Sequence, residues 1–69
     1  MLTFKVGDRC YVLMESGDLR KFVRVAGGKW RYKASNANVS DRDIRTTLKY
    51  RRAFLAHADD NIIEGNFND

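Results

Sequence analysis

Apolar and polar residues alternate most clearly between Leu19 and Lys33, where the sequence reads LRKFVRVAGGKWRYK. This period of two predicts two β-strands, and the Gly27-Gly28 pair between them supplies the positive φ angles of a two-residue type I′ turn. With that turn, one face is predicted to carry Leu19, Val23, Val25, Trp30 and Tyr32, and the other Arg20, Phe22, Arg24, Lys29, Arg31 and Lys33. The pattern therefore predicts a hairpin with an apolar face and a strongly basic face.

Apolar segments on either side extend this hairpin into a sheet. Residues 10–14 (CYVLM) are apolar at every position, which is typical of a strand that is covered on both sides. Residues 15–18 (ESGD) have the composition of a tight connection, so this strand and the hairpin form a predicted three-stranded meander. Val39 follows the turn-forming run SNAN and is expected in a short fourth strand.

Residues 40–59 allow two interpretations. In the first, Ser40 and Asp43 resemble a capping box and start a helix that runs to about residue 58. In the second, the strict alternation from Ile44 to Tyr50 and the β-branched Thr46-Thr47 pair indicate a last strand over residues 45–50, followed by a helix over residues 51–59. We prefer the second interpretation because the alternation is unbroken.

Three segments resemble the SH3-like small barrels of the Tudor, KOW and related groups. They are FKVGDR at residues 4–9 before the first core strand, GKWRY at residues 28–32, and VSDRDIR at residues 39–45 around a short strand, a turn and the start of the last strand. The resemblance covers about residues 4–50. It implies a mainly-β fold built on an SH3-like five-stranded small barrel.

The whole chain, residues 1–69, is expected to form a single domain, because its length is near the lower limit for independent folding. The barrel is predicted over about residues 2–50 and the helix over about 51–59, followed by a frayed acidic tail at 60–69. The alternative fold is a three-stranded antiparallel meander packed on one C-terminal helix, an α+β arrangement.

Charge is distributed unevenly along the chain. The formal net charge is +4, and all 13 Lys and Arg residues lie between Lys5 and Arg52. Beyond Arg52 the charged residues are all acidic. A basic body favours a polyanionic partner such as nucleic acid.

The candidate nucleic-acid-binding residues are the predicted basic face of the hairpin and its continuation along the last strand: Arg20, Phe22, Arg24, Lys29, Arg31, Lys33, Arg45 and Lys49. The arginines and lysines would contact phosphates without sequence preference, and Phe22 would stack on a base. The alternative is a protein-interaction module that binds an acidic protein surface and regulates or inhibits a larger enzyme, as small phage or plasmid effectors do. Its predicted contacts are Phe22, Tyr50 and Phe54.

Catalytic and metal chemistry is not expected. Cys10 and His57 are the only cysteine and the only histidine, too few for a zinc site within one chain, and Cys10 lies in an apolar strand as a buried structural residue would. No motif indicates a cofactor, and the protein is not expected to be an enzyme. One unpaired cysteine and the lack of a run of roughly 20 apolar residues predict a cytoplasmic protein with no membrane contact.

Overall fold

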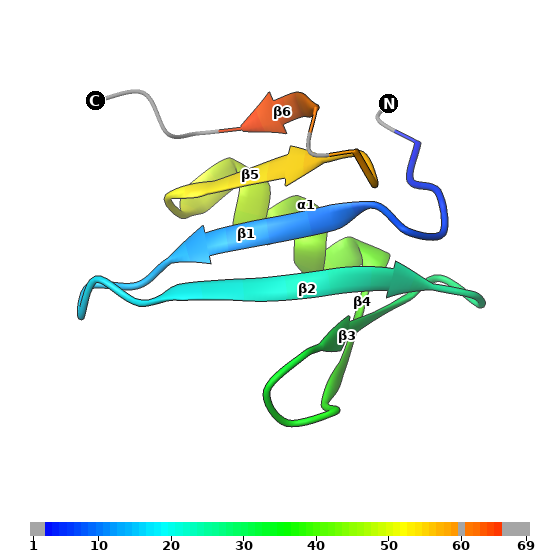
Figure 1. Cartoon of the computed structure of the whole chain (residues 1–69), viewed down its shortest axis with the longest axis horizontal. Coiled ribbons are helices and arrows are strands. Elements are labelled where there is room, and N and C mark those ends of the chain that lie inside the picture. Colours follow the sequence, from blue (N-terminus) through cyan, green and yellow to red (C-terminus); the bar gives the residue numbers. More distant parts are fainter. Residues whose placement is uncertain (1–2, 60, 66–69) are drawn as a thin grey trace.

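A computed structural model describes residues 3–59 and 61–65 and contains six antiparallel strands in one open sheet, with a single helix (Figure 1). In chain order the elements are β1 (Arg9–Leu13), β2 (Leu19–Val25), β3 (Lys29–Tyr32), β4 (Asn38–Ser40), α1 (Asp41–Tyr50), β5 (Ala53–Ala56) and β6 (Ile62–Gly65). The strand order in the sheet is β4-β3-β2-β1-β5-β6. The prediction of a mainly-β fold is confirmed.

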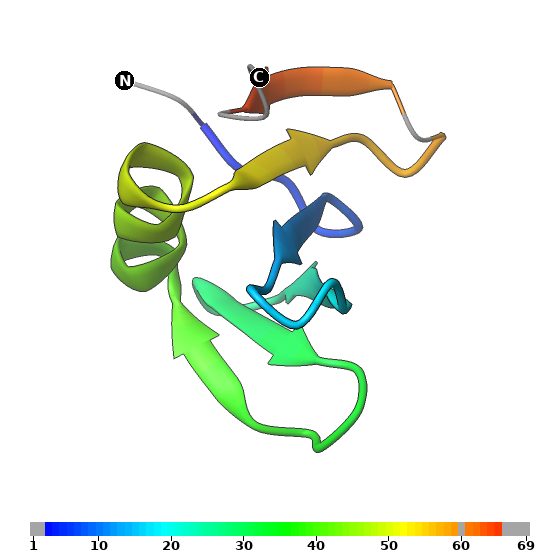
Figure 2. The ribbon, with the colours of Figure 1, turned by 90° about the vertical axis from the view of Figure 1, so that its left-hand side faces the viewer.

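The sheet has two different faces. Helix α1 lies against one of them, and the other is not crossed by any element of the described chain (Figures 1 and 2). The helix side of the sheet is here called the inner face. The residues that strand pairing places on it are Cys10, Val12, Arg20, Phe22, Arg24, Trp30, Tyr32, Val39, Ala53 and Leu55. The other side is here called the outer face. The residues that strand pairing places on it are Arg9, Tyr11, Leu13, Leu19, Lys21, Val23, Val25, Lys29, Arg31, Asn38 and Phe54.

The hydrophobic core lies between the inner face and α1. Trp30, Leu55 and Cys10 from the strands are fully buried, and α1 adds Ile44 at 1% and Leu48 at 8% exposure. These two helix residues are four positions apart, so they share one side of the helix. Phe4 closes the core from the N-terminal segment, with its ring edge-on to the Trp30 indole at 5.1 Å between centroids.

The predicted β2–β3 hairpin is present, but its predicted register is wrong by one residue. Val25 pairs with Lys29, so the connection contains three residues, 26–28, and not the Gly27-Gly28 pair alone. Both glycines have positive φ angles, 82° and 71°. Because side chains alternate between faces, a shift of one residue moves a whole strand to the other side of the sheet.

The consequence is that the predicted basic face does not exist as one surface. Arg24 pairs with Trp30 and Phe22 with Tyr32, so the side chains of β2 that were predicted to be basic and exposed share the inner face with the aromatic residues of β3. Lys29 and Arg31 lie on the outer face with Val23 and Val25.

The prediction for residues 40–59 is also wrong. Residues 41–50 form α1, which includes the segment predicted as a strand (45–50), and residues 53–56 form β5 within the segment predicted as a helix (51–59). The other interpretation was right about where the helix begins, because the Ser40 hydroxyl accepts a hydrogen bond from the Asp43 amide at 3.1 Å. It was wrong about the end, since α1 stops at Tyr50 and the helix of the α+β alternative is likewise not C-terminal.

The end of the chain and the closure of the sheet differ from the sequence-based expectations as well. Residues 62–65, predicted within a frayed tail, form β6 and pair with β5; residues 60 and 66–69 lie outside the described residues. The predicted five-stranded barrel is not formed, because β4 and β6 are the two edges of an open sheet.

Candidate nucleic-acid interface

The outer face is basic and carries no acidic residue at any of its positions in β1–β5. Its four cations, here called the outer-face cations, come from three neighbouring strands: Arg9 from β1, Lys21 from β2, and Lys29 and Arg31 from β3. Lys29 and Arg31 are exposed, and Arg9 and Lys21 are half-buried. The pairing of Arg9 with Val23 and of Val23 with Arg31 aligns two of these cations across the sheet.

An aromatic pair lies beside the cations on the same face. Tyr11 of β1 and Phe54 of β5 are directly paired, and their rings stack at 4.9 Å between centroids with an angle of 25°. The Lys21 ammonium lies 5.9 Å from the centre of the Tyr11 ring, on the β2 side. Both faces of that ring are therefore occupied, so Tyr11 stiffens the surface but is not an open platform for stacking bases.

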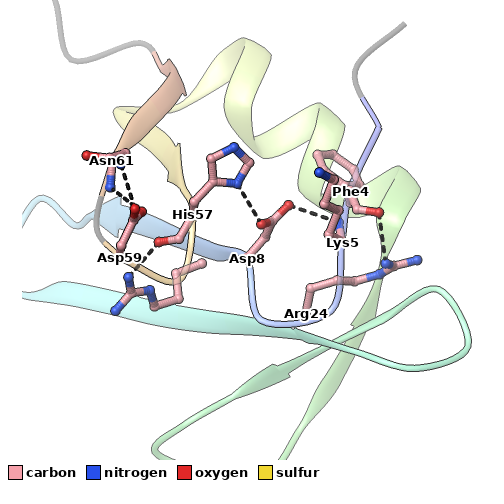
Figure 3. Close-up of polar contacts among 8 residues, drawn as sticks. Phe4, Lys5, Asp8, Arg24, His57, Asp59 and Asn61 are labelled. Carbon is pink, nitrogen blue, oxygen red and sulfur yellow. Dashed lines mark hydrogen bonds and ion pairs between the residues drawn. The ribbon is translucent and has the colours of Figure 1, made fainter.

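A polar network fixes one end of the outer face (Figure 3). The Arg9 Nη2 donates to the His57 carbonyl at 2.6 Å, and His57 Nδ1 lies 3.1 Å from the Asp8 carboxylate. Asp8 is 3% exposed, and its other oxygen accepts from the Lys5 amide at 2.9 Å. The network joins the N-terminal turn to the end of β5, and it holds the Arg9 side chain at this end of the outer face.

Arg24, which was predicted to contact phosphate, has a structural role. Its guanidinium Nη2 forms an ion pair with the Asp41 carboxylate at 2.9 Å, and Nη1 donates to the Phe4 carbonyl at 3.2 Å. The other Asp41 oxygen accepts from the Trp30 indole N–H at 2.6 Å. With a side chain only 14% exposed, Arg24 links β2, the N-terminal segment and the start of α1.

Arg20 and Phe22 lie on the inner face, away from the outer-face cations. The Phe22 ring stacks on Tyr32 at 5.1 Å and packs against the core. The Arg20 guanidinium lies 5.6 Å from the centre of the same Tyr32 ring. Lys33 is exposed in the turn just after β3, and its amide donates to the Lys21 carbonyl at 3.2 Å.

The remaining predicted residues are divided between α1 and β5. Arg45 lies over the Phe4 ring at 4.6 Å, and Lys49 lies 5.3 Å from the ring of Tyr50, which is 72% exposed.

Phe54 is on the outer face, so the three residues predicted for protein interaction, Phe22, Tyr50 and Phe54, do not form one contact surface. Of the eight predicted nucleic-acid contacts, only Lys29 and Arg31 belong to the outer face as defined by strand pairing.

Arg9, Lys21 and Tyr11 were missed by the sequence analysis. Lys21 stands between Arg20 and Phe22, and the assumed register assigned it to the apolar side of the hairpin. Lys21 was the one signal in the sequence that the face predicted to be apolar is exposed to solvent, because an unpaired lysine is rarely buried in a core.

Cys10 and His57 do not form a nucleophilic pair. Cys10 is fully buried, and burial raises the pKa of its thiol from 9.0 to about 12, so the thiol is protonated at neutral pH. His57 lies beside Asp8. Within the described part of the chain, no group of three or more His, Cys, Asp or Glu side chains is placed to hold a metal ion.

The raised pKa predicts how stability changes at alkaline pH. Between pH 9 and about 12 the folded protein retains a thiol proton that the unfolded chain has lost, so the free energy of unfolding decreases as pH rises. From pH 8 to pH 10 we expect the wild type to lose on the order of 1 kcal/mol more than Cys10→Ala, as measured by urea unfolding. Equal losses in the two proteins would mean that the Cys10 thiol ionises as readily in the folded state as in the unfolded chain.

Comparison with known proteins gives no relative from which a function can be taken. No family model matches the chain, and no curated protein or solved structure is similar enough to count as a match. Separately, α1, the helix of the described residues, is too short and too polar to cross a membrane.

Proposed function

We propose that this protein is a small non-catalytic cytoplasmic protein that binds the nucleic-acid backbone through the outer face of its sheet. The observation that carries the proposal is the composition of that face: four cations on three adjacent strands and no acidic residue among its positions in β1–β5, with no helix among residues 3–59 and 61–65 covering it. The partner and the mode of contact predicted from the sequence are retained. The residues are revised, because Arg20, Phe22 and Arg24 lie on the other face.

The physical basis of binding is the release of counterions. Each phosphate that a Lys or Arg neutralises frees condensed cations from the nucleic acid, which gives affinity that depends on salt and hardly on base sequence. Exposed Lys29 and Arg31 would make the first contacts, and the half-buried Arg9 and Lys21 would extend the path across the sheet. The stacked Tyr11 and Phe54 rings stiffen the neighbouring surface and leave little room for base recognition.

The test is binding of a fluorescein-labelled 20-nucleotide oligo-dT, followed by fluorescence anisotropy at 50, 100 and 200 mM NaCl. For a single strand, each neutralised phosphate contributes a slope of about −0.7 to log K against log salt. Four contacts predict a slope near −3. In Lys29→Ser/Arg31→Ser the slope is expected to be shallower by about 1.4, with weaker binding at 50 mM NaCl.

The matched control is Arg20→Ser/Arg51→Ser, which removes the same charge from the helix side of the molecule and is expected to leave the slope within about 0.3 of the wild type. A 20-base-pair duplex of mixed sequence should show the same ranking of the variants. The proposal is wrong if the wild type does not bind at 50 mM NaCl, or if affinity is independent of salt.

A further inference from the structure

A groove opens at the end of the molecule where the β1–β2 loop faces the turn between α1 and β5; both connections are at the left of Figure 1. Its volume is about 880 Å³. The residues that line it are Leu13, Met14, Glu15, Ser16, Gly17, Arg20, Tyr50, Arg51 and Arg52. A smaller recess of about 220 Å³ shares Met14, Arg20 and Arg51 with the groove and continues it between α1 and the sheet.

The two walls of the groove are held by backbone hydrogen bonds. The Leu13 amide donates to the Arg52 carbonyl at 2.8 Å, which ties the end of β1 to the turn before β5. The Arg51 amide donates to the Thr47 carbonyl at 2.9 Å and ends the helix. On the facing wall, the Gly17 amide donates to the Met14 carbonyl at 2.9 Å. The groove is therefore a formed feature of the fold, with its arginines on anchored backbone.

The chemistry of the groove combines cations with an apolar floor. Arg20, Arg51 and Arg52 are all exposed, and Arg20 is positioned over the Tyr32 ring at 5.6 Å. The inner recess is lined by the apolar residues Val12, Met14 and Phe22, together with Thr47 and the two arginines that it shares with the groove. Guanidinium groups match carboxylates in geometry, and a recess of this kind accepts one apolar side chain.

The groove also carries negative charge on the loop wall. Glu15 lines it, and Asp18, close by in the same loop, accepts from the Ser16 hydroxyl at 3.1 Å. A nucleic-acid strand has a phosphate at every residue and would be repelled at this wall. A peptide places its carboxylates individually, so it can meet the arginines, put an apolar residue into the recess and avoid Glu15.

From these features we infer that the groove binds an acidic peptide segment of a partner protein, with carboxylates on Arg20, Arg51 and Arg52 and one apolar side chain in the recess between α1 and β2. This is a second site, and none of the outer-face cations lines it. It does not depend on the proposed function, and each site is tested by its own variant.

The probes are fluorescein-labelled nonapeptides in which two glutamates lie on each side of a central residue and two glycines end each side. The central residue is leucine, isoleucine, methionine, phenylalanine or tyrosine, with glycine as the reference. We expect at least one apolar peptide to bind about tenfold more tightly than the glycine peptide at 50 mM NaCl, because its central side chain is removed from water in the recess. Arg20→Ser/Arg51→Ser should weaken that binding at least tenfold.

The matched control is Lys29→Ser/Arg31→Ser, which removes two cations from the outer face and should change peptide binding less than twofold. Far-UV circular dichroism and the urea midpoint establish that both variants are folded, which is expected because all four side chains are exposed. Peptide binding that is absent, indifferent to the central residue, or unchanged in Arg20→Ser/Arg51→Ser overturns the inference. Loss of oligo-dT binding in that variant assigns the groove to nucleic acid and overturns it as well.

Discussion

Replacing Asp41 by alanine is expected to lower the free energy of unfolding by about 3 kcal/mol. The Asp41 carboxylate accepts from the indole N–H of the fully buried Trp30 at 2.6 Å and pairs with Arg24 at 2.9 Å. Alanine leaves a buried N–H without an acceptor and a largely buried guanidinium without its counter-charge, and each of these losses is costly. It also removes an anion from the first turn of α1, a smaller effect.

Asp43→Ala is the matched control for this prediction. Asp43 is an exposed acid in the same first turn, so its loss costs the helix-dipole interaction, about 0.3–1 kcal/mol, and leaves the Trp30 and Arg24 contacts in place. Urea unfolding followed by tryptophan fluorescence measures both variants, and because Trp30 is the only tryptophan the signal comes from the core. Equal effects of the two substitutions would show that Asp41 acts only through the helix dipole.

Local patterns in the sequence were sufficient to locate the first four strands. A continuous apolar run indicated β1, alternation and glycine placement indicated the β2–β3 hairpin, and the turn-forming run before Val39 indicated the short β4. They did not determine the hairpin register, because a loop of two or three residues fits the same sequence, and Ala26 is compatible with either strand or turn. That single residue decided which side chains share a face, and it therefore decided the composition of the candidate site.

The predicted phosphate contacts also depended on tertiary structure that local sequence patterns do not determine. Arg24 has the sequence context of a surface cation, and only the tertiary structure brings it to Asp41, 17 residues further along the chain. Lys29 and Arg31 remain in the candidate interface because they alternate with Trp30 and Tyr32, which lie on the inner face. The contribution of Arg9 depends on His57, 48 residues away, which no local pattern indicates.

The helix was misassigned because two periodicities coincide between residues 44 and 50. Apolar residues at Ile44 and Leu48 fit one side of a helix as well as one side of a strand. The β-branched Thr46 and Thr47 favoured a strand, but in the structure both hydroxyls donate to the carbonyls four residues earlier, at 3.1 and 2.9 Å. Packing of Ile44 and Leu48 on the sheet outweighs the weak preference of threonine for strands.

Thr46→Pro is expected to lower the free energy of unfolding by about 3 kcal/mol or more. Thr46 is in the middle of α1 and exposed, so the substitution removes little packing. Proline removes the amide hydrogen bond to the turn before and clashes with the carbonyl of Arg42, four residues earlier. For a domain of this size that loss is a large part of the total stability, so we expect a substantial unfolded fraction by circular dichroism at 37 °C.

Thr46→Ala separates the helix from the strand that the sequence favoured. In a helix, alanine is the better residue by up to about 0.7 kcal/mol, and the lost hydroxyl contact with the Arg42 carbonyl offsets part of that gain. In a strand, threonine is the better residue, so the same substitution would lower stability. A urea midpoint equal to or above that of the wild type is therefore expected. A clear decrease for Thr46→Ala, together with a mild effect of Thr46→Pro, would contradict a helix at residues 41–50.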